Sequence, residues 1–251
     1  MRILVMNCNV TASMTDEIAA GARRFATPGT EIIGAQPTWG PASAEGYYES
    51  FITAAAVLDR LSTFPDPFDG VVMAGFGEHG REGARQLLDV PVVDITEAAA
   101  QLATLVSSRF GVVTTEQSAV ATIADSLTAA GLMSRCSGIV ASDVSVLDTG
   151  GDAHDSLATI ARASRALIDG GADAIVLGCA GFTGLDDVLE ELLGVPVIDG
   201  VTAAVALCES LVRLGKTTSK RGPYAAPDLT KASTGWPVGG AFATSVLQVT
   251  S

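Results

Sequence analysis

Short apolar runs alternate along the chain with longer segments in which apolar residues recur every three or four positions. The runs are typical of buried strands, and the longer segments are typical of helices that bury one face. This pattern predicts strands at residues 2–6, 30–35, 69–73, 91–94, 110–115, 137–141 and 174–177. It predicts helices at residues 14–25, 43–61, 80–88, 96–106, 117–130, 155–168, 183–192 and 201–214. Strands that alternate with helices indicate parallel sheets covered on both faces.

The ends of several predicted helices carry residues that favour a helix start. Ser43, Thr96 and Thr183 each precede or open a helical pattern, and a hydroxyl at that place can accept a hydrogen bond from a free backbone N–H group. We therefore expect these three residues to begin their helices. A loop is predicted around Gly150 and Gly151.

The chain contains an internal repeat. Residues 69–77 align with residues 173–181 without a gap, and residues 87–94 match residues 192–199 after one inserted residue. The repeat predicts an α/β protein of two doubly wound three-layer (αβα) domains with parallel sheets, related by a pseudo-twofold axis. Ligands of such sheets bind at the carboxyl ends of the strands, so we expect the site in the cleft between the domains.

The repeat also predicts where the domains divide. The helix at 201–214 repeats the helix at 96–106, so by symmetry it should return to the first copy and make that domain discontinuous. We expect a first α/β domain at residues 1–96 plus 204–224 and a second at residues 97–203. Residues 225–251 are rich in Gly, Ser and Thr and lack any period, which predicts a C-terminal arm or flexible tail.

Composition narrows the classes of function. The 251 residues carry a net charge of −13, which argues against nucleic acid or an anionic membrane surface as a partner. Four cysteines without CxxC spacing and only two histidines argue against structural metal and suit the cytoplasm. There is no signal-peptide pattern at the first residues and no apolar run long enough to span a membrane. No glycine motif for a nucleotide follows the first strand, so we expect no cofactor and a small-molecule substrate.

A thiol marks the carboxyl end of the strand at 174–177. Cys179 lies between the small residues Gly178, Ala180 and Gly181 at a predicted strand-to-helix corner. Backbone N–H groups at a helix start favour a thiolate, so this position predicts a depressed pKa for the Cys179 thiol and a catalytic role. In the repeat the matching residue is Gly75, so one wall of the expected cleft carries a thiol and the other carries no side chain.

Other residues near the predicted strand ends are candidates with two readings each. Glu78 and His79 could act as acid or base near the cleft, or serve as a first-turn carboxylate and a solvated imidazole. Amide, hydroxyl and backbone N–H groups could hold an imide, a carboxylate or an enolate, although capping would also explain the side chains among them. These candidate binding residues are Asn9, Thr11, Gly75, Phe76, Thr114, Thr115, Gly178, Ala180 and Gly181. Cys136 and Cys208 are expected in the core, and Cys8 either in the core or on the cleft floor.

Several motifs together resemble one enzyme superfamily over residues 1–224. They are residues 2–9 followed by Met14 and Thr15, Glu45-Gly46, Phe76-Gly77, residues 90–93 with Glu97, Ala98 and Ala99, residues 112–115, residues 177–181 and residues 195–199. The chain resembles the aspartate/glutamate/hydantoin racemase superfamily, most closely its hydantoin and allantoin racemase branch. The resemblance implies cofactor-independent proton transfer between two facing cysteines, one in each domain, with backbone amides and hydroxyls holding the substrate. It favours ligand contact for Asn9 and Thr115 over capping.

The sequence departs from the family pattern at the first cysteine. Gly75 stands where that cysteine precedes Phe76-Gly77, Glu78-His79 replaces an acidic residue and proline, and Cys8 replaces a common proline. Our hypothesis is a racemase or epimerase acting at the acidic α-carbon of a small cyclic ureide or an amino-acid-like substrate. Cys179 would act as a thiolate base, with Glu78, His79 or water as the second proton donor, and we expect a homo-oligomer.

Two alternatives remain open from the sequence. A single-cysteine decarboxylase, lyase or ring-opening enzyme of the same superfamily needs acid chemistry on only one face of the substrate. The other alternative is a ligand-binding form that lost catalysis together with its first cysteine. In that case Gly75 is either natural or engineered. Restoring the thiol with Gly75→Cys should raise racemase activity if the site otherwise follows the family.

Overall fold

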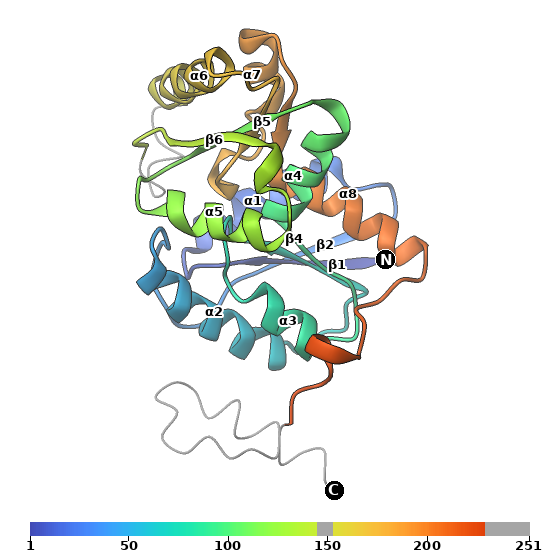
Figure 1. Ribbon diagram of the computed structural model, residues 1–251. Helices are drawn as coiled ribbons and strands as arrows, with labels where there is room; N and C mark the ends of the chain where they lie inside the picture. The colour runs from blue at the N-terminus through green and yellow to red at the C-terminus, as the bar shows by residue number, and fades with distance from the viewer. Residues whose placement is uncertain (145–152, 229–251) are drawn as a thin grey trace, which may run out of the picture.

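Two parallel sheets form the two halves of the molecule, as Figure 1 shows. The computed structural model describes residues 1–144 and 153–228, and within them each sheet has four strands. The first sheet has the order β2-β1-β3-β4, and the second has the order β6-β5-β7-β8. The strands of the first sheet are β1 (Arg2–Asn7), β2 (Glu31–Ala35), β3 (Gly70–Ala74) and β4 (Val92–Asp94). The strands of the second sheet are β5 (Phe110–Thr114), β6 (Cys136–Ala141), β7 (Ala174–Leu177) and β8 (Val197–Asp199).

Helices cover both faces of each sheet because the buried strands are apolar on both sides. In β1, Ile3 and Val5 belong to one core cluster, whereas Leu4 belongs to another on the opposite face. The helices are α1 (Ala12–Phe25), α2 (Tyr47–Ser62), α3 (Arg81–Leu87), α4 (Ile95–Val106), α5 (Ala119–Ala129), α6 (Ala153–Asp169), α7 (Asp186–Leu193) and α8 (Gly200–Arg213). The predicted fold of two doubly wound three-layer α/β domains is confirmed.

One large core joins the two halves. The core cluster that contains Ile3 of β1 also contains Ile95 of α4, Phe110 of β5 and Val201 of α8. Phe110 is fully buried, and burying a side chain of this size contributes about 2–3 kcal/mol. The inner faces of both sheets therefore share their apolar packing with the helices between them.

Helices α4 and α8 lie side by side between the sheets and cross to opposite halves (Figure 1). Helix α4 follows β4 of the first sheet but packs against β7 and α5 of the second half. Helix α8 follows β8 of the second sheet but packs against β3 and α1 of the first half. A side chain at Gly70 would place its Cβ 2.5 Å from Cys208 Sγ, so the absence of a side chain on β3 lets α8 approach closely.

Aspartate side chains begin both crossing helices, which corrects one expectation. Asp94 accepts hydrogen bonds from the N–H groups of Thr96 and Glu97, and Asp199 does the same for Val201 and Thr202. Thr96, predicted as the cap, lies inside α4 instead. A capping residue directly precedes the first helical residue and has an extended backbone conformation. Asp94 has that position and that conformation.

Two other predicted helix starts are also wrong. Helix α2 begins at Tyr47 rather than near Ser43, because Gly46, in an extended conformation, is the residue that directly precedes the helix. Helix α7 begins at Asp186, after a short 3-10 turn (Ala180–Phe182), and Thr183 closes that turn by donating its hydroxyl to the carbonyl of Ala180.

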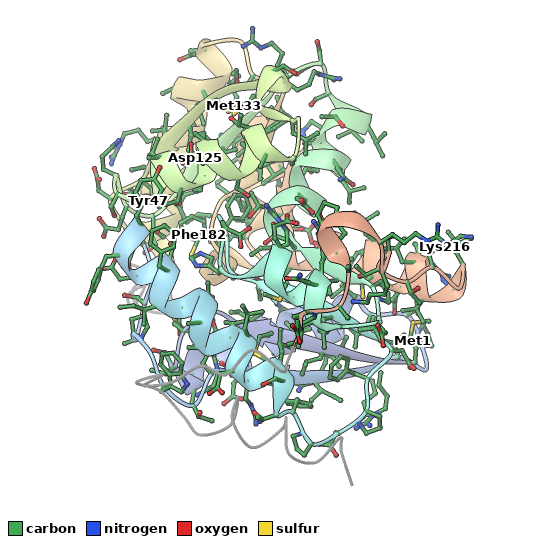
Figure 2. All side chains as sticks on the ribbon, turned by 60° about the horizontal axis from the view of Figure 1, so that its bottom comes forward. Met1, Tyr47, Asp125, Met133, Phe182 and Lys216 are labelled. Atoms are coloured by element: carbon green, nitrogen blue, oxygen red, sulfur yellow. The ribbon has the colours of Figure 1, made fainter. Side chains whose placement is uncertain are left out.

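Polar contacts also hold α2 and α5 together across the two halves. The hydroxyl of Tyr47 on α2 donates to Asp125 on α5 over 2.6 Å, and Figure 2 shows the two side chains next to each other. The buried Arg81 at the start of α3 donates to the hydroxyl of Ser126 on α5 over 3.0 Å. Together with the exchanged helices, these contacts fix how the two sheets face each other.

The segment after α8 returns to the first half. The hydroxyls of Thr218 and Tyr224 bond to Val90 and Glu82, and the Lys220 ammonium donates to the carbonyls of Arg85 and Gln86. The loop predicted around 150–151 and most of the predicted tail, from residue 229 on, lie outside the described residues. Within residues 1–144 and 153–228, no helix is both long and apolar enough to cross a membrane.

Candidate active site

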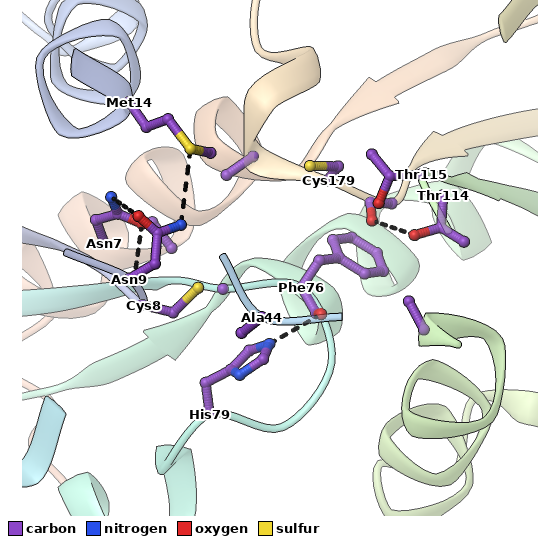
Figure 3. Close-up of a pocket in the computed structure, with 15 residues that line it drawn as sticks. Asn7, Cys8, Asn9, Met14, Ala44, Phe76, His79, Thr114, Thr115 and Cys179 are labelled. Atoms are coloured by element: carbon purple, nitrogen blue, oxygen red, sulfur yellow. Dashed lines mark hydrogen bonds between the residues drawn. The ribbon is translucent and has the colours of Figure 1, made fainter. Parts of the chain in front are cut away.

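A pocket opens between the carboxyl ends of the two sheets; the empty space in it, with the solvent at its mouth, is about 420 Å³. Figure 3 shows the side chains that line it, from β1, β3, β5, β7 and the segments that follow them. Among the predicted site residues it is lined by Asn9, Gly75, Phe76, His79, Thr114, Thr115, Gly178, Cys179 and Ala180. Sequence reasoning missed Asn7, Met14, Ala44, Ala74 and Ala119, and left Cys8 undecided.

Cys179 lies where the sequence places it, at the end of β7 and on the cavity wall. Its sulfur accepts a hydrogen bond from the N–H of Gly181 over 3.4 Å. Burial raises the pKa of the Cys179 thiol to about 11, because that one hydrogen bond does not offset the loss of water and the Glu45 carboxylate adds a negative charge nearby. The predicted depressed pKa is therefore wrong. Only the short turn at 180–182 follows the thiol, and α7 begins too far along the chain to act on it.

Gly178 and Thr114 shape the strand ends beneath Cys179. A Cβ at Gly178 would lie 2.8 Å from Val112 Cγ1 and 2.9 Å from the carbonyl oxygen of Val113, so no other residue fits there without a shift. The hydroxyl of Thr114 donates to the carbonyl of Gly178 over 3.0 Å. Thr114 therefore borders the cavity but uses its hydroxyl to join β5 to β7, while Thr115 borders the cavity one residue further on.

Asn9 is held in one orientation by its neighbours. Its side-chain oxygen accepts hydrogen bonds from Asn7 Nδ2 over 3.1 Å and from the N–H of Thr11 over 3.0 Å. Among the residues that the structure describes, its Nδ2 group has only the sulfur of Met14, at 3.7 Å, as a partner (Figure 3). A thioether is a weak acceptor, so the Asn9 amide can donate to a ligand oxygen in the cavity.

Three predicted site residues do not line the cavity. The hydroxyl of Thr11 donates to the carbonyl of Ala42, and the N–H of Gly181 donates to the sulfur of Cys179. Glu78 accepts hydrogen bonds from the N–H groups of Gly80 and Arg81, and its carboxylate pairs with the Arg81 guanidinium at 3.1 Å. These contacts give the Glu78 carboxylate the first-turn role at α3, and its role as an acid or base stays a prediction.

His79 is buried on the cavity wall, not solvated. It is 4 % exposed, and its Nε2 lies 3.2 Å from the carbonyl oxygen of Phe76. Since a carbonyl can only accept, Nε2 carries the hydrogen, and Nδ1 is left as an acceptor with no protein partner among the described residues. Burial lowers the pKa of His79 to about 4, so the ring is neutral near pH 7.

Gly75 directly follows β3 and lies beside Cys8, which directly follows β1. Asn7 pairs with Ala74 in the parallel register, so the next residues, Cys8 and Gly75, lie next to each other. A Cβ built on Gly75 would lie 2.7 Å from Cys8 Cβ, 3.0 Å from Cys8 Sγ and 2.5 Å from His79 Cδ2. The expectation of a wall without a thiol is therefore incomplete: Gly75 has no side chain, but the Cys8 thiol lines the same wall.

The two cavity thiols share one electrostatic environment. Burial first, and then the charge of Cys179, raises the pKa of the Cys8 thiol to about 12. The carboxylate of Glu45, beside the cavity residue Ala44, raises the pKa of both thiols. No group of three or more His, Cys, Asp or Glu side chains could hold a metal ion in the part of the chain that the structure describes.

Comparisons with known proteins find relatives that are similar in sequence and in structure. The family model described as Asp/Glu/Hydantoin racemase matches residues 3–208. Hydantoin racemase from Pseudomonas sp. (strain NS671) is 36 % identical over 230 residues, which cover 91 % of this chain and 92 % of that protein. The crystal structure of allantoin racemase from Pseudomonas fluorescens is 50 % identical with a TM-score of 0.91, over 93 % of this chain and 100 % of that one. Allantoin racemase from Klebsiella pneumoniae is 41 % identical with a TM-score of 0.89, over 94 % and 97 %.

Proposed function

Because the chain belongs to the Asp/Glu/hydantoin racemase family, we propose that it racemises a small cyclic ureide of the hydantoin or allantoin type. The enzyme is a cofactor-independent racemase, and the proposal concerns its substrate and its base. The observation that supports both is a partly buried thiol, Cys179, on the wall of a small pocket between two sheets. The hydrogen that is moved is the one on the carbon next to the ring carbonyl.

Cys179 acts as the base in this proposal. Its thiolate removes the α-hydrogen as a proton, so an S–H bond forms while the C–H bond breaks and the electron pair moves onto the ring carbonyl as an enolate. The raised pKa of the Cys179 thiol makes the thiolate scarce near pH 7 but strongly basic once it forms. A strong base suits a carbon that is only weakly acidic.

Polar groups around the cavity suit the ring of a cyclic ureide. The Nδ2 group of Asn9 and the backbone N–H groups of Phe76 and Ala180 would donate to the carbonyl oxygen that becomes the enolate. The unpartnered Nδ1 of His79 would accept from a ring N–H, since a cyclic ureide offers donors as well as carbonyls. His79 is then a binding residue rather than the second acid.

The test is a screen of single enantiomers of allantoin and of 5-substituted hydantoins. We expect the circular dichroism of at least one of these substrates to decay to zero with enzyme, after subtraction of the spontaneous rate. In deuterated water the recovered substrate should carry deuterium on the α-carbon. If neither decay nor deuterium uptake exceeds the enzyme-free control for any of them, the proposed substrate class is wrong.

A further inference from the structure

A network of four buried side chains surrounds Gly77, in the loop that carries the cavity residues Phe76 and His79. Its members are Arg81, Asp94, Thr96 and Ser126. We propose that Ser126, on α5 of the second half, is a positioning residue for racemisation: its hydroxyl holds the carbonyl of Gly77 and thereby keeps the N–H of Phe76 aimed at the substrate carbonyl that becomes the enolate. The inference rests on the racemisation proposed above. Ser126 itself does not line the cavity, so it acts through Gly77.

Both backbone polar groups of Gly77 bond to side chains of other helices. Its N–H donates to the Thr96 hydroxyl on α4 over 2.8 Å, and its carbonyl accepts from the hydroxyls of Ser126 over 3.1 Å and Thr96 over 3.3 Å. Thr96 is fully buried and Ser126 is 3 % exposed, so these hydrogen bonds are shielded from water and stronger than exposed ones. A loop between β3 and α3 of the first half is thus held by α4 and α5.

Arg81 fixes the direction of the Ser126 hydroxyl. A guanidinium can only donate, and Arg81 Nη1 lies 3.0 Å from Ser126 Oγ, so the single hydrogen of that hydroxyl is left for the carbonyl of Gly77. The same Nη1 lies 3.4 Å from Asp94 Oδ1, and that oxygen accepts from the N–H of Thr96 over 2.9 Å. The network is therefore a closed circuit in which each member orients the next.

The peptide bond between Phe76 and Gly77 is held at both ends. Its N–H bonds to Thr96, while its carbonyl oxygen lies 3.2 Å from Nε2 of His79 (Figure 3). On the other side of Phe76 stands Gly75, and glycine restricts the backbone least of all residues. The restraint on the N–H of Phe76 must therefore come from the residues that follow it, which are the ones that the network holds.

The backbone conformation of Gly77 also depends on these contacts. Its φ is +117°, in a region that glycine enters and leaves with little cost. The loop sequence alone does not select this conformation, whereas three hydrogen bonds to Thr96 and Ser126 do. The shape of a cavity wall in the first half is thus set in part by a serine of the second half.

A fixed donor matters most when negative charge develops on the substrate. An enolate carries that charge on the former carbonyl oxygen, and a donor already aimed at this oxygen stabilises it without reorganisation. The neutral substrate gains less from the same donor. Loosening the N–H of Phe76 should therefore lower kcat and leave KM nearly unchanged, because the lost interaction belongs to the transition state.

The experiment compares Ser126→Ala and Ser126→Thr with Ser164→Ala in the full-length enzyme. Ser164 is a matched control, because its buried hydroxyl also donates to a carbonyl, that of Ile160 over 2.8 Å, but lies on α6 and outside the cavity. With single enantiomers of allantoin, or of the hydantoin that the wild type racemises, Ser126→Ala should lower kcat at least about 10-fold and change KM less than about threefold. Ser126→Thr, which keeps the hydroxyl, and Ser164→Ala should stay within about threefold of the wild type in both constants.

Deuterium uptake gives a second measurement. In deuterated water, exchange of the α-hydrogen by Ser126→Ala should fall by the same factor as racemisation, because both pass through the enolate. Thermal melting checks the fold. If Ser126→Ala does not fold, Ser126→Cys takes its place, since a thiol is a weaker donor of similar size and should show the same loss in kcat.

Three outcomes overturn the inference. The first is a folded Ser126→Ala enzyme whose kcat falls by less than about 10-fold. The second is a rise in KM that accounts for the whole loss, because the hydroxyl would then serve binding alone. The third is a Ser126→Thr enzyme as slow as Ser126→Ala at an unchanged melting temperature. A wild type that racemises none of these substrates refutes the proposed function instead, so the two failures are distinguishable.

Discussion

The two halves of the molecule share one plan and differ at the place where chemistry occurs. Both sheets have the same parallel order, and both connect to a crossing helix that begins at an aspartate, Asp94 or Asp199. At the cavity, however, one half offers Cys8 beside Gly75 and the other offers Thr115 beside Cys179. The two copies of the repeat thus share their strand order and crossing helices, and they differ in the residues that follow the strands.

The two halves differ in which of two adjacent strand ends carries the thiol. The side chains that follow β1 and β3 leave the sheet next to each other, so a thiol on either one reaches the cavity, provided that the other position is small.

The largest effect is expected when the thiol of the second half is removed. Cys179→Ala should lower racemisation by at least about 1,000-fold, because the base is lost while the small side chain leaves the fold intact. Circular dichroism decay of the substrate measures the rate, and thermal melting checks the fold. Cys136→Ala is the matched control. A loss of only a few-fold would mean that Cys179 is not the base.

Adding a side chain to the first half tests how tightly Cys8 and Gly75 depend on each other. Gly75→Cys should destabilise the protein by up to about 3 kcal/mol and should lower activity, because its Cβ would overlap Cys8 and His79. This reverses the expectation from sequence that the substitution raises activity. Urea unfolding measures the loss.

The double variant Cys8→Gly/Gly75→Cys is the control for that crowding. It removes the contacts with Cys8 but keeps the contact with His79 Cδ2, so its stability should lie between those of the single variant and the wild type. If Gly75→Cys alone is as stable as the wild type, the space at Gly75 is less crowded than the distances indicate.

His79 belongs to the first half alone and gives that half a pH dependence. Its pKa is lowered from 6.5 to about 4 in the folded state, so between these values the unfolded chain binds a proton that the folded protein does not. Stability from this group is complete above pH 6.5 and is lost as the pH falls toward 4. From pH 7 to pH 5 we expect a loss of about 2 kcal/mol that His79→Gln lacks. Urea midpoints of both proteins across this range measure it, and parallel pH profiles would contradict the burial of a neutral ring.

The smallest effect is expected at Glu78, which does not line the cavity. Glu78→Gln should cost about 1 kcal/mol, because the side chain begins α3 and pairs with Arg81 near the surface. Its racemisation rate should stay close to that of the wild type. A loss of about 100-fold or more, the contribution of a general acid or base, would return Glu78 to the list of proton donors.

The sequence was sufficient for the fold because the fold depends on local patterns that repeat. Apolar runs and helical periods located the strands, and the match between residues 69–77 and 173–181 predicted two equivalent sheets. The residues that cap the helices were harder to predict from the sequence. Asp94 and Thr96 can both begin a helix, and only the backbone conformation in the folded chain decides between them.

The site was predicted in part because its residues depend on strand order as well as on strand ends. Cys179 follows directly from one strand, so local reasoning placed it on the cavity wall. Cys8 required the knowledge that β1 and β3 are neighbours in register, which the chain between residues 7 and 70 does not reveal. The pKa of Cys179 was mispredicted because burial of the thiol, which depends on the packing of the whole molecule, outweighs the hydrogen bond from the N–H of Gly181.

The exchanged helices make each half incomplete without the other. Helix α8 covers β3 and α4 covers β7, and a side chain on Gly200 at the start of α8 would come within 3.2 Å of Ile95 at the start of α4. An isolated first or second half would expose the apolar face that the other half's helix normally covers. We therefore expect the two copies of the repeat to unfold together, because they share one apolar core.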